Sequence, residues 1–208
     1  AGHALVGIKL PASHPIHKAT IIPRGRSLGM VQRLPENDVV SESLEQLEAS
    51  IAVAMAGRVA EEIIFGRDKV TSGASSDIRM ATTIARAMVT EWGLSEKIGT
   101  IYHGASNDDM YSNSRGGGAR SDHTSELIDE EVKRLVDQGY NVATNILTKH
   151  LDQLHLLAKA LIEHETLSGT QINNLLAGKE LNTEAEAPAE AAKPEEKVKV
   201  KRQSKSEE

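Results

Sequence analysis

Because the chain has no cysteine, its candidate metal ligands are its eight histidines and its carboxylates, and the histidines come first. The absence of cysteine also excludes disulfides and thiolate metal sites. His14 and His17 have HxxH spacing, but Pro15 between them disfavours the regular helix that would turn both rings to one face. We interpret this pair as ordinary loop histidines. The same interpretation covers the histidines of an amphipathic helical pattern further along the chain: His150, His155 and His164.

His3 differs from the others because of its neighbours. Ala1-Gly2-His3-Ala4 is what remains of the sequence His-Glu-Ala-Gly-His-Ala when its first two residues are removed. The intact motif places two histidines at i and i+4 on one helical face, where both bind one Zn²⁺, and the Glu after the first His serves as general base. These four residues alone leave His3 open between a metal ligand and an ordinary histidine.

Two carboxylates are candidates for a further metal ligand. Glu61 lies on the helix predicted after the motif, as the third ligand does in thermolysin-like zinc peptidases. Its alternative is a polar face near a helix C-terminus, where a carboxylate needs a local partner. Asp77 lies in the first turn of another predicted helix, and its alternative role is to stabilise that N-terminus. The residue types alone do not decide between the two.

The elements that must position these residues are mostly helices. Two short strands are predicted at 19–22 and 28–33, where small and β-branched residues meet turn residues. Ser43 and Gln46 have the spacing of a capping box and begin a helix that Gly66 ends. The very small side chains in the middle of this helix predict that another backbone approaches closely. Apolar periodicity predicts the remaining helices at about 75–92, 121–150, 151–164 and 170–177.

Composition limits what the chain can be. Of its 208 residues 39% are apolar and only 2% aromatic, which suits helices packed through aliphatic side chains. A net charge of −6 argues against nucleic-acid binding, which needs Lys and Arg to neutralise phosphates. No apolar stretch approaches the roughly 18 residues needed to span a bilayer. The first residue is Ala rather than Met, so we expect that Ala1 is not the native start.

Two segments are predicted to lie outside the packed domain. Residues 101–120 are rich in Gly, Ser, Asn and Asp, which predicts a mobile surface loop; their glycine triplet lacks the Lys-Ser/Thr of a phosphate-binding loop. Residues 179–208 are mainly Glu, Ala, Lys and Pro, and cannot bury enough apolar surface to offset the entropy of ordering. We therefore predict a mainly α domain over 1–178, with a small N-terminal β element, followed by a disordered charged tail over 179–208.

Several segments of this domain, in this order, resemble the peptidase portion of FtsH-type ATP-dependent zinc metalloproteases. They are HKATIIPRG (17–25), AGRVAEEIIFG (56–66), TSGASSDI (71–78), MVTEWGLS (88–95) and IDEEV (128–132). The resemblance spans roughly residues 1–178 and stops at the tail. Each segment alone is moderately specific, and their shared order makes the set highly specific.

The resemblance implies a Zn²⁺ site in which His3 is the second ligand and Asp77, in preference to Glu61, is the third. The first His and the general-base Glu would lie just before Ala1, so this chain would hold no catalytic residue itself. Zinc-activated water would hydrolyse peptide bonds of unfolded or damaged proteins. The strand around 27–33 would pair with the extended substrate backbone.

The resemblance also implies a homo-hexamer and a membrane-anchored protein, with membrane helices and an ATP-binding AAA module upstream of this chain. The location would be the cytoplasmic face of a bacterial inner membrane or, alternatively, a mitochondrial inner membrane, and the fragment itself would be soluble. Two alternatives follow from the missing His-Glu: a catalytically inactive helical oligomerisation fragment, or a degenerate member of the family.

Overall fold

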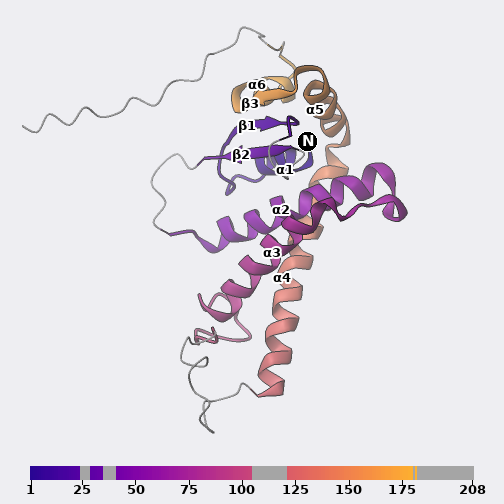
Figure 1. The fold of residues 1–208 in the computed structure, drawn as a ribbon. Helices are drawn as coiled ribbons and strands as arrows, with labels where there is room; N and C mark the ends of the chain where they lie inside the picture. The colour runs from indigo at the N-terminus through magenta and orange to yellow at the C-terminus, as the bar shows by residue number, and fades with distance from the viewer. Residues whose placement is uncertain (24–28, 35–40, 105–120, 180, 182–208) are drawn as a thin grey trace, which may run out of the picture.

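The computed structural model describes residues 1–23, 29–34, 41–104, 121–179 and 181 (Figure 1). These residues form six α-helices, three short strands and two short 3-10 turns. The predicted mainly helical fold with a small β element is therefore confirmed. Beyond residue 104 the predicted loop at 101–120 lies outside the described residues, and so does nearly all of the tail predicted at 179–208.

The central helix is α2 (Leu44–Phe65), which contacts α1 (Gly2–Lys9), α3 (Ser75–Thr90) and α4 (Asp122–Lys149). Its start is the predicted capping box: the Gln46 backbone N–H donates to Ser43 Oγ at 3.3 Å, and the Ser43 N–H donates to Gln46 Oε1 at 2.8 Å. Its end is the predicted Gly66, at φ 81°, a value that glycine adopts without strain.

Two helices approach α2 closely at glycines, as its small side chains predict. A Cβ on Gly2 of α1 would lie 2.7 Å from the Ala56 carbonyl oxygen. A Cβ on Gly139 of α4 would lie 2.6 Å from Cγ2 of Ile51. Both distances are too short for a real side chain. The first turn of α1, which carries His3, is therefore held directly against the backbone of α2.

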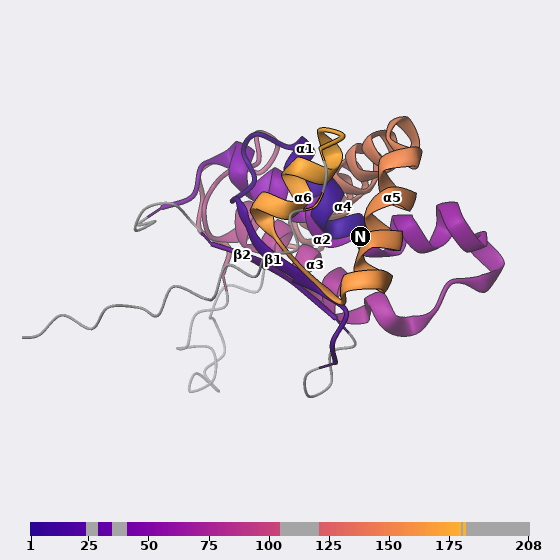
Figure 2. The ribbon, with the colours of Figure 1, turned by 90° about the horizontal axis from the view of Figure 1, so that it is seen from above.

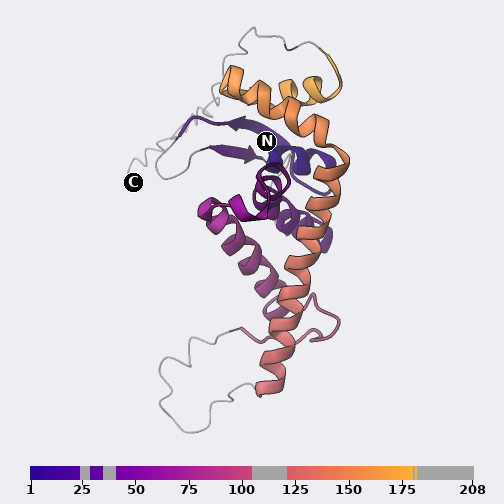
Figure 3. The same cartoon turned by 90° about the vertical axis from the view of Figure 1, so that its right-hand side faces the viewer.

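The long helix α4 joins the two ends of the molecule (Figures 1 and 3). Beside one part of it, α3 and α2 enclose an aliphatic cluster that includes Ile51, Met88, Ile128 and Leu135. Toward the other end lie α5 (Leu151–His164), α6 (Gly169–Leu176) and the sheet. Their shared cluster includes Leu5, Val59, Leu147, Leu157 and Leu167. Among the described helices, none combines the length and the hydrophobicity needed to cross a lipid bilayer.

The sheet is antiparallel, with β1 (Ile16–Thr20) between β2 (Met30–Arg33) and β3 (Thr166–Ser168). Figure 2 shows the strands lying next to α1 and α6. The first strand begins earlier than predicted, at Ile16, and ends before Ile21. The Ile21 N–H still donates to the Glu165 carbonyl, but Glu165 itself, at φ 60°, has left the extended conformation. The third strand was not predicted. It places β2 and β3 at the two edges of the sheet.

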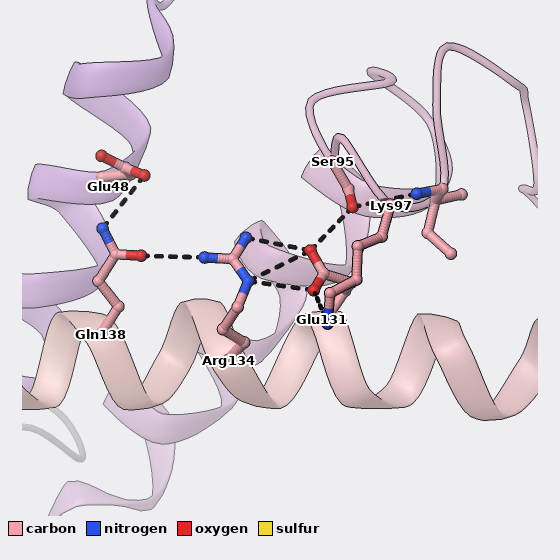
Figure 4. Close-up of polar contacts among 7 residues, drawn as sticks. Glu48, Ser95, Lys97, Glu131, Arg134 and Gln138 are labelled. Atoms are coloured by element: carbon pink, nitrogen blue, oxygen red, sulfur yellow. Dashed lines mark hydrogen bonds and ion pairs between the residues drawn. The ribbon is translucent and has the colours of Figure 1, made fainter.

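A buried carboxylate fastens the segment that follows α3 to α4. Glu131 is only 1% exposed, and its carboxylate accepts hydrogen bonds from the guanidinium of Arg134 and the hydroxyl of Ser95 (Figure 4). Lys97 Nζ lies 3.1 Å from Glu131 Oε1. The hydrogen bonds continue from Arg134 to Gln138, and from there to Glu48 on α2. These donors, with Arg134 first, lower the pKa of Glu131 to about 2.

Candidate metal centre

His3 and Asp77 meet in space although they are far apart in the sequence. His3 lies in the first turn of α1 and Asp77 in the first turn of α3. The distance between His3 Nε2 and Asp77 Oδ2 is 3.4 Å. Their side chains are 31% and 28% exposed, so both are packed on one side and open on the other. The structure thus brings together the two residues that the family resemblance implies as metal ligands.

The other ring nitrogen of His3 fixes how the imidazole faces Asp77. Nδ1 lies 2.7 Å from the backbone carbonyl oxygen of Val53. Because a carbonyl oxygen only accepts, Nδ1 must carry the hydrogen in this contact. In neutral imidazole the lone pair is then on Nε2, the atom that points to Asp77. A metal-ligating histidine commonly donates its second N–H in this way, which orients the ring.

Gly57 of α2 makes room for the imidazole. A Cβ at this position would lie 2.6 Å from His3 Nε2, 2.8 Å from Cε1 and 3.4 Å from Asp77 Oδ2. Glycine inside a helix costs about 1 kcal/mol relative to alanine. The close approach of the His3 ring gives this glycine a physical role.

The donor pair fits a zinc ion. A neutral imidazole nitrogen and a carboxylate oxygen are both electron-pair donors, so their facing one another calls for a proton or a cation between them. Zinc binds such atoms at about 2.0–2.2 Å in a tetrahedral arrangement, which places two ligand atoms about 3.4 Å apart. The observed 3.4 Å between Nε2 and Oδ2 has this value.

Two protein ligands do not complete a catalytic zinc site, which has three plus a water. In the part of the chain that the structure describes, no group of three or more His, Cys, Asp or Glu side chains is arranged to hold a metal. A site of this kind built on His3 and Asp77 would therefore need one further protein ligand.

Glu61, the rival candidate, is engaged elsewhere. Its Oε2 accepts from the backbone N–H of Thr71 at 3.1 Å, and its Oε1 accepts from the Thr71 hydroxyl at 3.1 Å. Both carboxylate oxygens therefore hold the loop that leads to Asp77. This geometry supports Asp77 over Glu61 as the ligand and gives Glu61 a separate role in holding that loop.

The neighbouring carboxylate, Glu62, also has the local partners expected near a helix C-terminus. Arg58 Nε donates to Glu62 Oε1 at 2.9 Å, and the Tyr140 hydroxyl donates to Oε2. The hydrogen bond from Tyr140 is the largest cause of a lowered pKa at Glu62, and the same bond raises the pKa of Tyr140. Glu62 is therefore ionised near neutral pH.

A cleft of about 830 Å³ opens beside the His3–Asp77 pair. Glu61 and Met80 line it from the helices, and residues 29–31 line it from the start of β2. An extended peptide lying along β2 would therefore pass close to His3 and Asp77.

A histidine and a carboxylate that face one another beside a cleft of a helical scaffold fit the class of zinc metallopeptidases. The comparison with known families agrees, because residues 1–175 match peptidase family M41. The chain belongs to this family and corresponds to the peptidase portion of FtsH-type proteases.

Relatives confirm the resemblance seen in the sequence. The chain is 68% identical over 185 residues to the "ATP-dependent zinc metalloprotease FtsH" of Rickettsia bellii, covering 89% of this chain and 29% of the relative. It is 50% identical over 192 residues to the protein of the same name from Caulobacter vibrioides, covering 91% of this chain and 31% of the relative. The chain thus spans under a third of the length of these relatives.

Sequence reasoning missed residues that contact the His3 ring or the loop leading to Asp77. They are the Val53 carbonyl, Gly57, Arg58 and Thr71. Only Gly57 carries a sequence signal, because an isolated glycine inside a helical pattern often marks a close approach. The other three look like ordinary helix and loop residues.

Proposed function

We propose that His3 and Asp77 are two protein ligands of the catalytic zinc ion of a metalloendopeptidase. The observation that carries this proposal is the 3.4 Å separation of His3 Nε2 and Asp77 Oδ2, with Nδ1 bound to the Val53 carbonyl. The family and the names of the relatives support zinc and peptide hydrolysis.

The residues of this chain would have different roles in binding zinc and substrate. Zinc bound there would polarise the scissile carbonyl and activate a water molecule. His3 would offer a neutral, oriented nitrogen, and Asp77 would offer a negative oxygen. The edge strand β2 would hold the substrate by backbone hydrogen bonds, which carry little sequence preference and suit unfolded proteins as substrates.

The remaining His ligand and the general-base Glu would come from the residues that precede Ala1 in the gene. Sequencing the coding DNA immediately upstream of the Ala1 codon tests this. Codons for His-Glu directly before Ala1 would complete the motif and support an active protease. Other codons there would favour a helical oligomerisation fragment or a degenerate member of the family.

Substitution of the two carboxylates tests the ligand assignment. In the full-length protein, Asp77→Ala should abolish zinc binding and proteolysis while ATPase activity is retained. Glu61→Ala, made in parallel, should keep zinc binding measurable because both Glu61 oxygens are hydrogen-bonded to Thr71. Full zinc content and full proteolysis in Asp77→Ala would remove Asp77 from the site.

We further propose that the whole protein is an ATP-dependent homo-hexamer anchored in a bacterial inner membrane, with this portion on the cytoplasmic face. ATP dependence is supported by the names of the relatives, and those proteins extend well beyond the matched region. The hexamer, the membrane anchor and the degradation of unfolded proteins rest on the FtsH-type resemblance.

A further inference from the structure

We propose that Arg58 is a positioning residue for Asp77, acting through the backbone of Thr71. This inference rests on the proposed role of Asp77 as a zinc ligand. Arg58 lies on α2 and, in the described part of the chain, forms no hydrogen bond with His3 or Asp77. Its guanidinium instead joins α2 to the loop from which α3 begins.

Thr71 is held by α2 at each of its polar groups. Its carbonyl oxygen accepts from Arg58 Nη1 at 3.2 Å. Its backbone N–H and its hydroxyl both donate to Glu61, at 3.1 Å each. Glu61 and Arg58 are nearly one helical turn apart on α2, so both hydrogen-bonding partners of Thr71 belong to the same helix.

The position of Thr71 determines where α3 begins. Its Oγ1 accepts from the Gly73 N–H at 3.1 Å and caps the 3-10 turn Ser72–Ala74. α3 starts directly after this turn, and Asp77 lies in its first turn. Because the N-cap residue Ala74 has no polar side chain, it cannot cap the helix itself. The hydrogen bonds from Arg58 and Glu61 to Thr71 therefore attach the chain leading to Asp77 to α2.

Arg58 is itself held in place by the carboxylate of Glu62, which also accepts a hydrogen bond from α4. Glu62 accepts from Arg58 Nε at 2.9 Å and, through its other oxygen, from the hydroxyl of Tyr140 on α4. The Arg58 and Glu62 side chains are 26% and 19% exposed, so solvent screens this pair only in part. Nε and Nη1 of one planar group serve two acceptors, a geometry that the single ammonium of lysine cannot reproduce.

The contact with the His3 ring and the contact with the loop before Asp77 thus come from adjacent residues of α2. Gly57 contacts the His3 ring, and Arg58 reaches the loop of Asp77. A shift of that loop would change the 3.4 Å separation between the two ligand atoms. Outer residues that orient metal ligands typically alter metal affinity by about 10–100-fold when replaced.

The test compares Arg58→Met with Arg86→Met in the full-length protein. Arg86 is a matched control, because it also forms an arginine–carboxylate pair, with Asp129 at 3.1 Å, but on an exposed surface of α3 and α4. Zinc affinity is measured by competition with a chromophoric chelator, and amide hydrogen exchange of residues 71–77 is measured in the zinc-free protein. We expect Arg58→Met to weaken zinc binding about 10–100-fold and to speed this exchange. Arg86→Met should change neither, and Arg58→Lys should restore only part of the affinity.

Each outcome bears on the proposal. Wild-type zinc affinity and wild-type exchange at 71–77 in Arg58→Met would overturn it. If Arg58→Met does not fold, Tyr140→Phe decides: it removes one hydroxyl and should weaken zinc binding several-fold, and unchanged affinity would count against the proposal. Asp77→Ala separates the two levels of inference. Unchanged zinc affinity in Asp77→Ala would refute the ligand assignment itself. If Asp77→Ala loses zinc binding while Arg58→Met behaves as wild type, only the role of Arg58 is refuted.

Discussion

Replacing Gly57 with alanine should weaken zinc binding without weakening the zinc-free fold. The added methyl would lie 2.6 Å from His3 Nε2 and 2.8 Å from Cε1. Ordinary contacts between such atoms are about 3.5 Å or longer, so the imidazole must move by about 1 Å. Zinc sites tolerate deviations of only about 0.2 Å in ligand distance. We therefore expect the affinity for zinc to fall about 100-fold or more, the upper end of what a displaced orienting group costs.

The stability of the zinc-free protein should hardly change, because two effects oppose each other. Alanine in place of a helical glycine stabilises by up to about 1 kcal/mol. Displacing the His3 ring breaks its 2.7 Å hydrogen bond to the Val53 carbonyl, which costs about 1 kcal/mol. Calorimetry in the presence of a chelator would measure the melting temperature, and competition with a chromophoric chelator would measure zinc affinity.

Gly139→Ala is the matched control, because Gly139 is likewise a glycine inside a helix where an added Cβ would clash. Its Cβ would lie 2.6 Å from Cγ2 of Ile51 and 3.1 Å from the backbone nitrogen of Ala52, in the aliphatic core. Overpacking of this kind costs about 1–3 kcal/mol. This variant should melt earlier yet bind zinc normally while folded. The reasoning fails if Gly57→Ala binds zinc as tightly as the unaltered protein.

Two further predictions concern stability. The pKa of Glu131 is lowered to about 2 from a usual value near 4.5, so its contribution to stability is complete above about pH 5 and disappears as the pH falls toward 2. The shift corresponds to about 3 kcal/mol, and denaturant unfolding between pH 6 and pH 2 should show a shallower acid slope in Glu131→Gln than in the unaltered protein. Ser168→Ala removes the side-chain half of the capping box at the start of α6, where Ser168 Oγ accepts from the Gln171 N–H at 3.2 Å. It should lower the free energy of unfolding by about 1 kcal/mol; no change in a denaturant titration would contradict this cap energy.

Helix positions were predictable because their signals are local. The capping box at Ser43 and the glycine at 66 lie within one turn of the helix ends that they determine. The small side chains of α2 also predicted close helix packing, which Gly2 and Gly139 now show. The boundary of the domain at residue 178 stays a prediction.

Pairing between distant segments was not predictable in the same way. β3 has only three residues, and its partners in β1 lie at the other end of the described chain. The helix predicted to reach residue 92 ends at Thr90, and Trp92 is 50% exposed. The reason is a C-terminal turn in which the Leu94 N–H donates to the Met88 carbonyl around Gly93, at φ 63°.

The two ligand candidates were identifiable from sequence, but only partly from the residues themselves. A carboxylate at 61 and one at 77 were equally plausible by chemistry, and the resemblance to FtsH-type proteases selected Asp77. The structure adds a physical reason, because both oxygens of Glu61 are occupied by Thr71 while Asp77 faces His3. No residue pattern near Glu61 contained this information, because Thr71 lies beyond the end of its helix.

The His3–Asp77 pair depends on a helix to which neither residue belongs. Val53, Gly57 and Glu61 follow one another at intervals of four residues, so they lie along one face of α2. The first orients the His3 ring, the second makes room for it, and the third holds the loop before Asp77. Because α2 is also the centre of both aliphatic clusters, this face is fixed by the core of the protein. The separation of His3 Nε2 and Asp77 Oδ2 is therefore set by contacts along one face of α2, which explains how residues on two other helices lie at the distance that a zinc ion would require.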